Sequence, residues 1–277
     1  MDKQVKLGRH SYTMKKVVWL SLRPETPARF YWDQHLLELA FKDYNHSLEI
    51  TDQKEAIVII PGAYQAYLIN EINQELSKLD KCVVIITSDE ENNFPIDKLS
   101  HKNMKVFATY PTVQMENVGW LPIGYPPHAR MKKHYKDIDW FFAGQVNHES
   151  RRLMVENVKD IPNGQLHISG GFAQGLDHEE YCKLMSRSKI VLCPNGNISP
   201  DSFRLYETLE AGGIPIVESQ YFWDKMFKTV PFPIVGNSLQ WRDAINILLS
   251  DYNKYQLVVN KWWKDTKNNI FDMLRSL

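Results

Sequence analysis

The sequence predicts an α/β protein built from two parallel-sheet domains, and two observations support this prediction. Short apolar runs, which are typical of strands buried on both faces, alternate with segments whose apolar residues recur at helical spacing. This alternation lapses between Asn117 and Asp137 and then begins again. Because strands that alternate with helices pair in parallel through right-handed crossovers, each half is expected to form a Rossmann-like sheet with helices on both faces.

The amino-terminal half contains five apolar runs that predict strands. They lie at residues 17–22, 48–51, 56–60, 82–87 and 105–109. Two helices are expected between them, at residues 31–42 and 67–79. In the second helix, Ile72, Leu76 and Leu79 recur at a spacing that places them on one face. We expect this domain to cover residues 1–125, with a polar tail at 1–13.

The second alternation follows a segment rich in proline and basic side chains, which predicts an interdomain linker at residues 126–138. Strands are expected at residues 140–143, 165–169, 190–193, 214–217 and 232–235, and helices at 149–160, 179–187 and from Ser202 to the Gly212-Gly213 pair. The second domain is expected to cover residues 139–250. A helical segment at 251–277 then has the length to cross back to the first domain.

The composition limits the function classes. The 277 residues are 43% hydrophobic and 24% charged, which is typical of an ordered soluble protein with room for two domains. Lys plus Arg and Asp plus Glu both number 33, so no net field favours nucleic acid or an anionic membrane. The three cysteines lie in apolar segments without paired spacing and are expected to be reduced. No apolar run approaches the ~20 residues of a membrane span, and the first residues lack a signal peptide's apolar region, so we expect a cytoplasmic protein.

The stretch from Ser186 to Val217 concentrates polar chemistry at the end of a predicted strand. Asp201 or Ser202 is expected to cap the following helix, and Arg204 falls in its first turn. A cation there is unfavourable, because the helix dipole places positive charge at the amino end, and a bound anion would reverse that balance. Glu207 lies one turn further on. Together these residues predict a ligand that is phosphorylated and rich in hydroxyl groups.

This stretch resembles the sugar-nucleotide site of exostosin-like glycosyltransferases. The resemblance rests on a strand that ends in Cys193-Pro194, on the helix Ser-Phe-Arg-x-x-Glu-x-Leu-x-Ala-Gly at 202–212, and on the Ile-Pro-containing strand that begins at Ile214; it covers residues 139–220. It implies a GT-B fold, with two Rossmann-like domains facing a central cleft and a C-terminal helix crossing back. It also implies a nucleotide-diphosphate sugar donor, with a UDP-sugar as the first choice.

The same resemblance implies roles for individual residues. Arg204 would bind the diphosphate, with Ser202 and Phe203 beside it, and Glu207 would accept hydrogen bonds from the ribose hydroxyls. Ser202 could instead only cap the helix, and Arg204 could form a surface ion pair.

Further donor-site candidates come from other strand ends. Gly144 and Gln145 follow the first strand of the second domain, where a glycine would allow phosphate to approach the backbone. Arg151, or its neighbour Arg152, would supply a second cation. Asn195 would bring a backbone N–H group to the ligand or would only form a turn.

Direct glycosyl transfer needs a base that removes the acceptor proton, and a GT-B enzyme takes it from the amino-terminal domain. Asp33, Asp89 and Glu90 are the candidates, since they follow predicted strands; His35 is a weaker one. Retaining GT-B enzymes of the commonest kind carry two glutamates eight positions apart, whereas Ser199 stands eight positions before Glu207. The inverting course is therefore expected.

Two further expectations concern metal and acceptor. The pair Asp137 and Asp139 precedes its strand, unlike the metal-binding pair of GT-A transferases, and a metal-independent reaction is predicted. The expected acceptor is a carbohydrate or polysaccharide. One alternative is a hydroxymethylated base of phage DNA, contacted by the basic segments 130–136 and 254–267 with Trp262 and Trp263. A non-catalytic carbohydrate-binding or nucleotide-sugar-binding protein is the alternative of another class.

Overall fold

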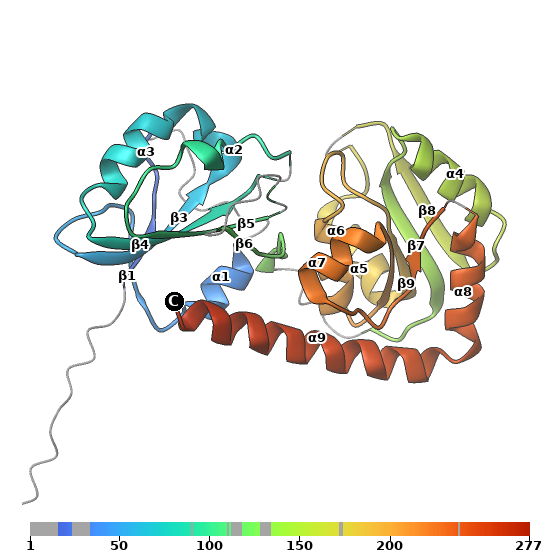
Figure 1. Cartoon of the computed structure of the whole chain (residues 1–277). Coiled ribbons are helices and arrows are strands. Elements are labelled where there is room, and N and C mark those ends of the chain that lie inside the picture. Colours follow the sequence, from blue (N-terminus) through green and yellow to red (C-terminus); the bar gives the residue numbers. More distant parts are fainter. Residues whose placement is uncertain are drawn as a thin grey trace, which may run out of the picture.

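Two separate parallel sheets form the framework of the protein (Figure 1). The first has the strand order β2-β1-β3-β4-β5-β6 and the second β11-β10-β9-β7-β8. The computed structural model describes residues 16–23, 34–89, 91–109, 111, 118–127, 134–171, 174–237 and 239–277. All strand pairings in it are parallel. The predicted α/β class with two Rossmann-like sheets is confirmed.

The first sheet is buried on both faces because its strands alternate between two apolar clusters. Ile57 and Ile59 of β3 face the cluster that contains α1, whereas Val58 and Ile60 face the cluster that contains α3. The strands are β1 (Lys16–Trp19), β2 (Asn45–Ser47), β3 (Glu55–Pro61), β4 (Lys81–Thr87), β5 (Met104–Ala108) and β6 (Val118–Trp120). The helices are α1 (His35–Ala40), α2 (Gly62–Gln65), η1 (Ala66–Leu68), α3 (Ile69–Leu76) and η2 (Ile96–Lys98).

The second sheet has fewer strands, and its central strands β7 and β9 lie almost entirely in the core. Its strands are β7 (Ile138–Gln145), β8 (Gly164–Ser169), β9 (Ser188–Cys193), β10 (Ile214–Glu218) and β11 (Ile234–Val235). The helices are α4 (Glu149–Val158), α5 (His178–Arg187), α6 (Phe203–Glu210), α7 (Gln220–Phe227), α8 (Gln240–Ser250) and α9 (Tyr252–Arg275). None of the described helices is long and apolar enough to cross a membrane.

Among the elements that differ from the sequence prediction, three have a clear physical reason. The second strand lies at Asn45–Ser47 rather than at 48–51: it is a polar edge strand, held to β1 by a hydrogen bond from Trp19 Nε1 to His46 Nδ1 of 2.9 Å. Strand β6 was not predicted because three residues carry too little periodicity, and α7 was not predicted because its apolar run follows β10 directly.

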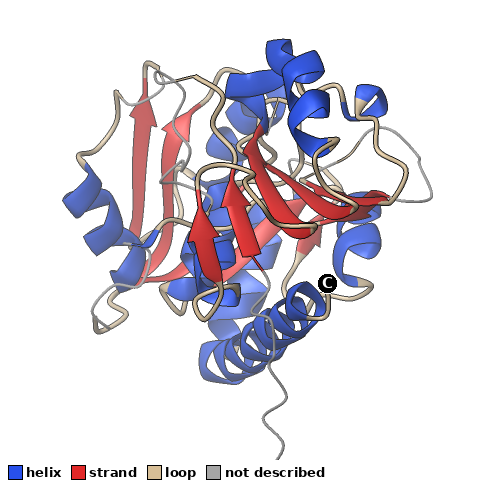
Figure 2. Ribbon diagram, turned by 90° about the vertical axis from the view of Figure 1, so that its left-hand side faces the viewer, coloured by secondary structure: helices blue, strands red, loops and turns tan. Residues whose placement is uncertain are grey.

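Helix α9 joins the two domains, as predicted for the crossing helix; in both views it lies below the sheets (Figure 1, Figure 2). Midway along it, the Trp263 ring lies 5.8 Å from that of Tyr206 on α6 and 6.3 Å from that of Tyr125, between centroids. At its end, Arg275 Nε donates to the Ala40 carbonyl of α1 at 2.9 Å. The buried apolar cluster is therefore continuous across both domains.

The carboxyl ends of the two sheets also meet directly. The Ile123 N–H, just after β6, donates to Asp201 Oδ2 at 2.9 Å, and Asp201 lies in the loop after β9. Beside this contact, Trp120 of β6 lies 5.7 Å from Phe222 of α7, between ring centroids. Residues that follow the strands of both domains are thereby brought to one region.

The arrangement of α9 bears on the expectation that Trp262 and Trp263 could stack on a flipped base, and contradicts it for Trp263. Trp263 is only 3% exposed and donates from Nε1 to Glu210 at 2.7 Å. Trp262 packs edge-on against Phe227 and Phe232. Trp263 therefore lies in the core and is not placed to stack on a base, whereas Trp262 is partly buried. Of the basic segment 130–136, residues 130–133 lie outside the described residues, and Lys136 Nζ donates to the Ala211 carbonyl at the end of α6.

Replacing Trp263 with alanine is expected to lower the free energy of unfolding by about 3–5 kcal/mol, because it opens a cavity where α9, α6 and Tyr125 meet. Urea unfolding followed by circular dichroism measures this. Leu257→Ala is the control on the same helix, since Leu257 is 72% exposed and its loss should change stability by less than about 0.5 kcal/mol. Equal effects of the two variants would contradict the assigned role of Trp263.

Candidate functional site

The candidate site lies at the carboxyl ends of β7, β9 and β10, beside the amino end of α6. Strand β9 ends at Cys193 and is followed by a tight loop that leads to the N-cap Ser202. A Cβ atom at Gly196 would lie 2.7 Å from the Ser199 carbonyl oxygen, so only glycine fits there. In this architecture, ligands bind outside the carboxyl ends of the strands.

The Arg204 side chain is fixed at the carboxyl edge of the second sheet by a hydrogen bond and a ring contact. Its Nη2 donates to the Ala143 carbonyl at 2.7 Å, and its guanidinium lies 4.9 Å from the centre of the Phe142 ring. Its Nε is buried without a protein partner. A Cβ atom on Gly144 would lie 2.6 Å from Nη2. Gly144 therefore makes room for the guanidinium, and its predicted contact with phosphate stays a prediction.

Arg151 of α4 lies beside Arg204 and is 8% exposed. It donates to the carbonyls of Gln145, at 3.1 Å, and Asn195, at 2.5 Å, and so ties the end of β7 to the loop after β9. Burial lowers its pKa to about 10, and the nearby charge of Arg204 acts in the same direction, while Glu218 opposes them. Gln145 contributes to the site through its backbone carbonyl, which accepts a hydrogen bond from Arg151.

The positive charge of this pair is not balanced by ion pairs. Among the residues that the structure describes, no carboxylate lies within salt-bridge distance of Arg151 or Arg204, and all their hydrogen bonds go to backbone carbonyls. Two adjacent, partly desolvated cations at the amino end of a helix favour an anion. A ligand with two phosphates matches that requirement.

Glu207 lies one turn along α6 from Arg204 and is 5% exposed. The Tyr181 hydroxyl of α5 donates to Glu207 Oε2 at 2.7 Å. Burial raises the pKa of Glu207, while the Tyr181 hydrogen bond and the Arg204 charge oppose this rise. A carboxylate held in this way accepts hydrogen bonds from hydroxyl groups.

The remaining donor-site predictions have mixed outcomes. Ser202 occupies the N-cap but makes no capping hydrogen bond; its own N–H instead donates to Asp201 Oδ1 at 3.1 Å. Phe203 is partly buried and packs on the core. The Asn195 N–H donates to Glu218 Oε2 at 3.1 Å, which favours the turn-forming alternative for this residue.

The predicted bases lie on the other domain. Asp33 and Glu90 are outside the described residues. Asp89 is 3% exposed, and its carboxylate accepts the N–H groups of Asn93, at 2.7 Å, and Phe94, at 3.0 Å. This carboxylate shapes its own loop. His35 begins α1, with its Nδ1 3.4 Å from Glu38 Oε2.

The aspartate pair considered for a metal lies at the opposite edge of the second sheet. Asp137 and Asp139 stand at the amino end of β7 and form ion pairs with Arg187 and Lys189. In the described part of the chain, no group of three or more His, Cys, Asp or Glu side chains is arranged to bind a metal.

Two site residues were not found from the sequence. Tyr181 reaches Glu207 across 26 residues, and Glu218 reaches Asn195 across 23 residues. The one available signal for Glu218 is its position as a charged residue at the end of a buried strand. Nothing in the local pattern marks Tyr181.

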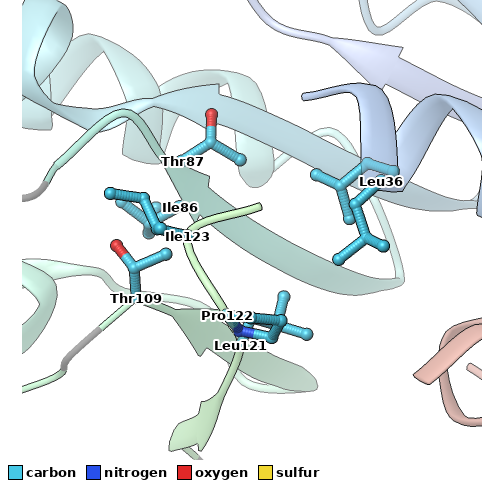
Figure 3. Close-up of a pocket in the computed structure, with 8 residues that line it drawn as sticks. Leu36, Ile86, Thr87, Thr109, Leu121, Pro122 and Ile123 are labelled. Carbon is cyan, nitrogen blue, oxygen red and sulfur yellow. The ribbon is translucent and has the colours of Figure 1, made fainter. Parts of the chain in front are cut away.

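The first sheet has a small cavity at its carboxyl edge, with the Thr87 and Thr109 hydroxyls as its polar side-chain groups (Figure 3). It is lined by Leu36, Leu37, Ile86, Thr87, Thr109, Leu121, Pro122 and Ile123. The centre of a water molecule has only about 10 Å³ of free space in it, close to the minimum for one ordered water. This cavity is too small for a sugar ring.

Gly144→Ala is expected to weaken binding of a diphosphate ligand, because the added methyl group displaces the Arg204 guanidinium from its seat. Titration calorimetry with UDP should show an affinity about tenfold lower, which corresponds to one charge-assisted hydrogen bond. The control is Gly236→Ala, where a Cβ atom would meet the nearest atom at an ordinary 3.6 Å. Unchanged affinity in Gly144→Ala would show that the position of Arg204 is not set in this way.

Solved structures with the same fold include the Anabaena protein Alr3699/HepE in complex with UDP-glucose, which has a TM-score of 0.54 and 12% sequence identity and covers 95% of this chain and 100% of that chain. The structure of HepE with UDP and glucose gives a TM-score of 0.53 with the same identity and coverage. AviGT4, a glycosyltransferase involved in avilamycin A biosynthesis, gives 0.49 at 12% identity over 93% of this chain and 98% of that chain. No protein-family model matches the chain, so membership of the exostosin-like family stays a prediction. The likeness to HepE confirms the predicted GT-B fold class.

Proposed function

We propose that the protein is a glycosyltransferase that moves a sugar from a UDP-sugar to an acceptor hydroxyl. The observation that carries this proposal is the pair of adjacent guanidinium groups, Arg151 and Arg204, which have no ion-pair partner among the described residues. They lie where the fold binds ligands, and the similar fold of HepE is known with UDP-glucose bound.

Different side chains are proposed to bind different parts of the donor. Arg204 and the amino end of α6 bind the diphosphate, and Arg151 adds a second positive charge behind it. Glu207, oriented by the Tyr181 hydroxyl, accepts the ribose hydroxyls. Because the two guanidiniums are already fixed by backbone carbonyls, they meet the growing negative charge on the departing diphosphate with little reorganisation.

The reaction we propose is a direct, inverting displacement. A base removes the proton from the acceptor hydroxyl, the oxygen attacks the anomeric carbon, and the bond from that carbon to the diphosphate oxygen breaks. Ser199 stands where the commonest retaining enzymes have a second glutamate; it is 2% exposed, and its hydroxyl accepts the Asp201 N–H at 3.0 Å. A structural role for Ser199 fits the inverting course. Charge neutralisation by arginines makes the reaction metal-independent in this proposal.

The acceptor we propose is a carbohydrate bound by the amino-terminal domain. That domain also supplies the base, for which Asp33 and Glu90 remain the main candidates. Asp89 is a weaker candidate, because its carboxylate is already engaged by two backbone N–H groups.

Arg204→Ala and Glu207→Gln are expected to weaken UDP binding by about 10- to 100-fold, because each removes charge-assisted hydrogen bonds. Calorimetry and the UDP-induced rise in melting temperature measure this. Arg152→Ala is the matched control: Arg152 is exposed on α4 next to the buried Arg151, and its loss should leave the affinity within about twofold. Similar UDP affinities in all three variants and the wild type would sink the site assignment.

A transfer assay with carbohydrate acceptors and hydroxymethylated DNA should show that either Asp33→Asn or Glu90→Gln lowers kcat by about 10²- to 10⁴-fold, as expected for loss of a general base, with UDP affinity unchanged. Asp89→Asn should chiefly lower the melting temperature.

Addition of a metal chelator should leave the transfer rate unchanged, and loss of activity would contradict metal independence. Donor binding without turnover on any acceptor would support the non-catalytic binding protein instead.

A further inference from the structure

A buried carboxylate connects the donor loop to the amino-terminal domain. We define the donor loop as residues 194–202, between β9 and α6. Asp201 in this loop is 2% exposed. Its Oδ2 accepts the Ile123 N–H at 2.9 Å, and its Oδ1 accepts the Ser202 N–H at 3.1 Å. One side chain thus joins the N-cap of α6 to the segment that follows β6.

A displacement of Asp201 would be transmitted through the donor loop to the candidate site. The Asp201 N–H donates to Ser199 Oγ at 3.0 Å, and the loop closes tightly over Gly196. On the other side of Asp201 comes Ser202, and Arg204 follows within the first turn of α6. The position of the Arg204 backbone therefore depends on where Asp201 is held.

The buried environment of Asp201 disfavours the charged form of its carboxyl group. The groups that face it are the N–H groups of Ile123 and Ser202 and the Tyr206 hydroxyl, which lies near without the geometry of a full hydrogen bond. No cation acts on it among the described residues. Burial raises its pKa to about 7, although these three groups oppose the rise.

We propose that Asp201 is a positioning residue: its carboxylate ties the donor loop to the Ile123 backbone and so holds the anion-binding end of α6 in register with the amino-terminal domain. The statement that Asp201 positions the donor-binding end of α6 rests on the proposed function. The bond between the domains stands independently of it. Ligand binding at α6 is then sensed at Ile123, on the domain expected to hold the acceptor.

Residue-resolved hydrogen exchange at the Ile123 amide tests the bond directly. In Asp201→Ala the exchange rate should rise about tenfold or more, because the Ile123 N–H loses its hydrogen-bond acceptor. In Asp201→Asn the rate should stay within about threefold of wild type, since the amide oxygen still accepts the Ile123 N–H. Asp177→Ala is the matched control: Asp177 caps α5 by accepting the Glu180 N–H within the second domain, and its loss should leave Ile123 unaffected.

The same measurement with UDP tests the coupling. Saturating UDP should slow Ile123 exchange about threefold or more in the wild type and leave it unchanged in Asp201→Ala. If UDP fails to bind the wild type, the proposed function fails, and the bond is still judged from the unliganded comparison. Unchanged Ile123 exchange in Asp201→Ala overturns the proposal. If Asp201→Ala does not fold, Asp201→Asn decides: an Ile123 rate that leaves the wild-type range overturns the proposal, and a rate within that range supports it.

The pH dependence gives an independent readout. A carboxyl group whose pKa is higher in the folded than in the unfolded state contributes stability at low pH that is lost as the pH rises from about 4 to about 7. Asp201→Asn should therefore melt at a higher temperature than the wild type at pH 8.5, and the difference should be about half as large at pH 5.5. An equal difference at both pH values would show that Asp201 is not buried as a charge.

Discussion

The constraint on which the site depends is the burial of two like charges side by side. Burial and the neighbouring charge of Arg204 both disfavour the charged form of Arg151. The protein offsets this with backbone carbonyls at the ends of β7 and β9, which are fixed dipoles and leave the net charge in place. This pair of adjacent cations, which forms no ion pair among the described residues, is the basis of the diphosphate site proposed above.

Helix α6 carries both the site and the join between the domains. Arg204 and Glu207 lie one turn apart and face the ligand region, whereas Tyr206 and Glu210, four residues apart, face α9. Glu210 accepts hydrogen bonds from Trp263 and Lys267 of α9. An eight-residue helix is too short to be stable alone, so its position is set by these contacts. Any movement of α9 relative to the second domain would therefore move Arg204 as well.

The sequence predicts well what depends on local pattern and poorly what depends on distant pairs. Strand β9 and the start of α6 at Ser202 follow from periodicity and capping residues, as does the placement of Arg204 in the first turn. The packing of Arg204 against Gly144 was not predicted, because the sequence cannot show that a side chain from 60 residues further on lies there. The Tyr181 contact to Glu207 and the Asp201 contact to Ile123 are equally invisible, since each joins segments far apart in the chain.

The positions of two aromatic side chains and one basic side chain on α9 bear on the choice between the two proposed acceptors. A base taken out of a duplex is usually gripped by stacking on aromatic rings, and duplex DNA is held by an excess of cations. Trp263 is buried in the core, Trp262 packs on Phe227 and Phe232, and Lys267 forms an ion pair with Glu210. The chain as a whole has no net charge. Neither Trp263 nor Lys267 is therefore free to contact DNA, which supports the carbohydrate acceptor proposed above over a modified base.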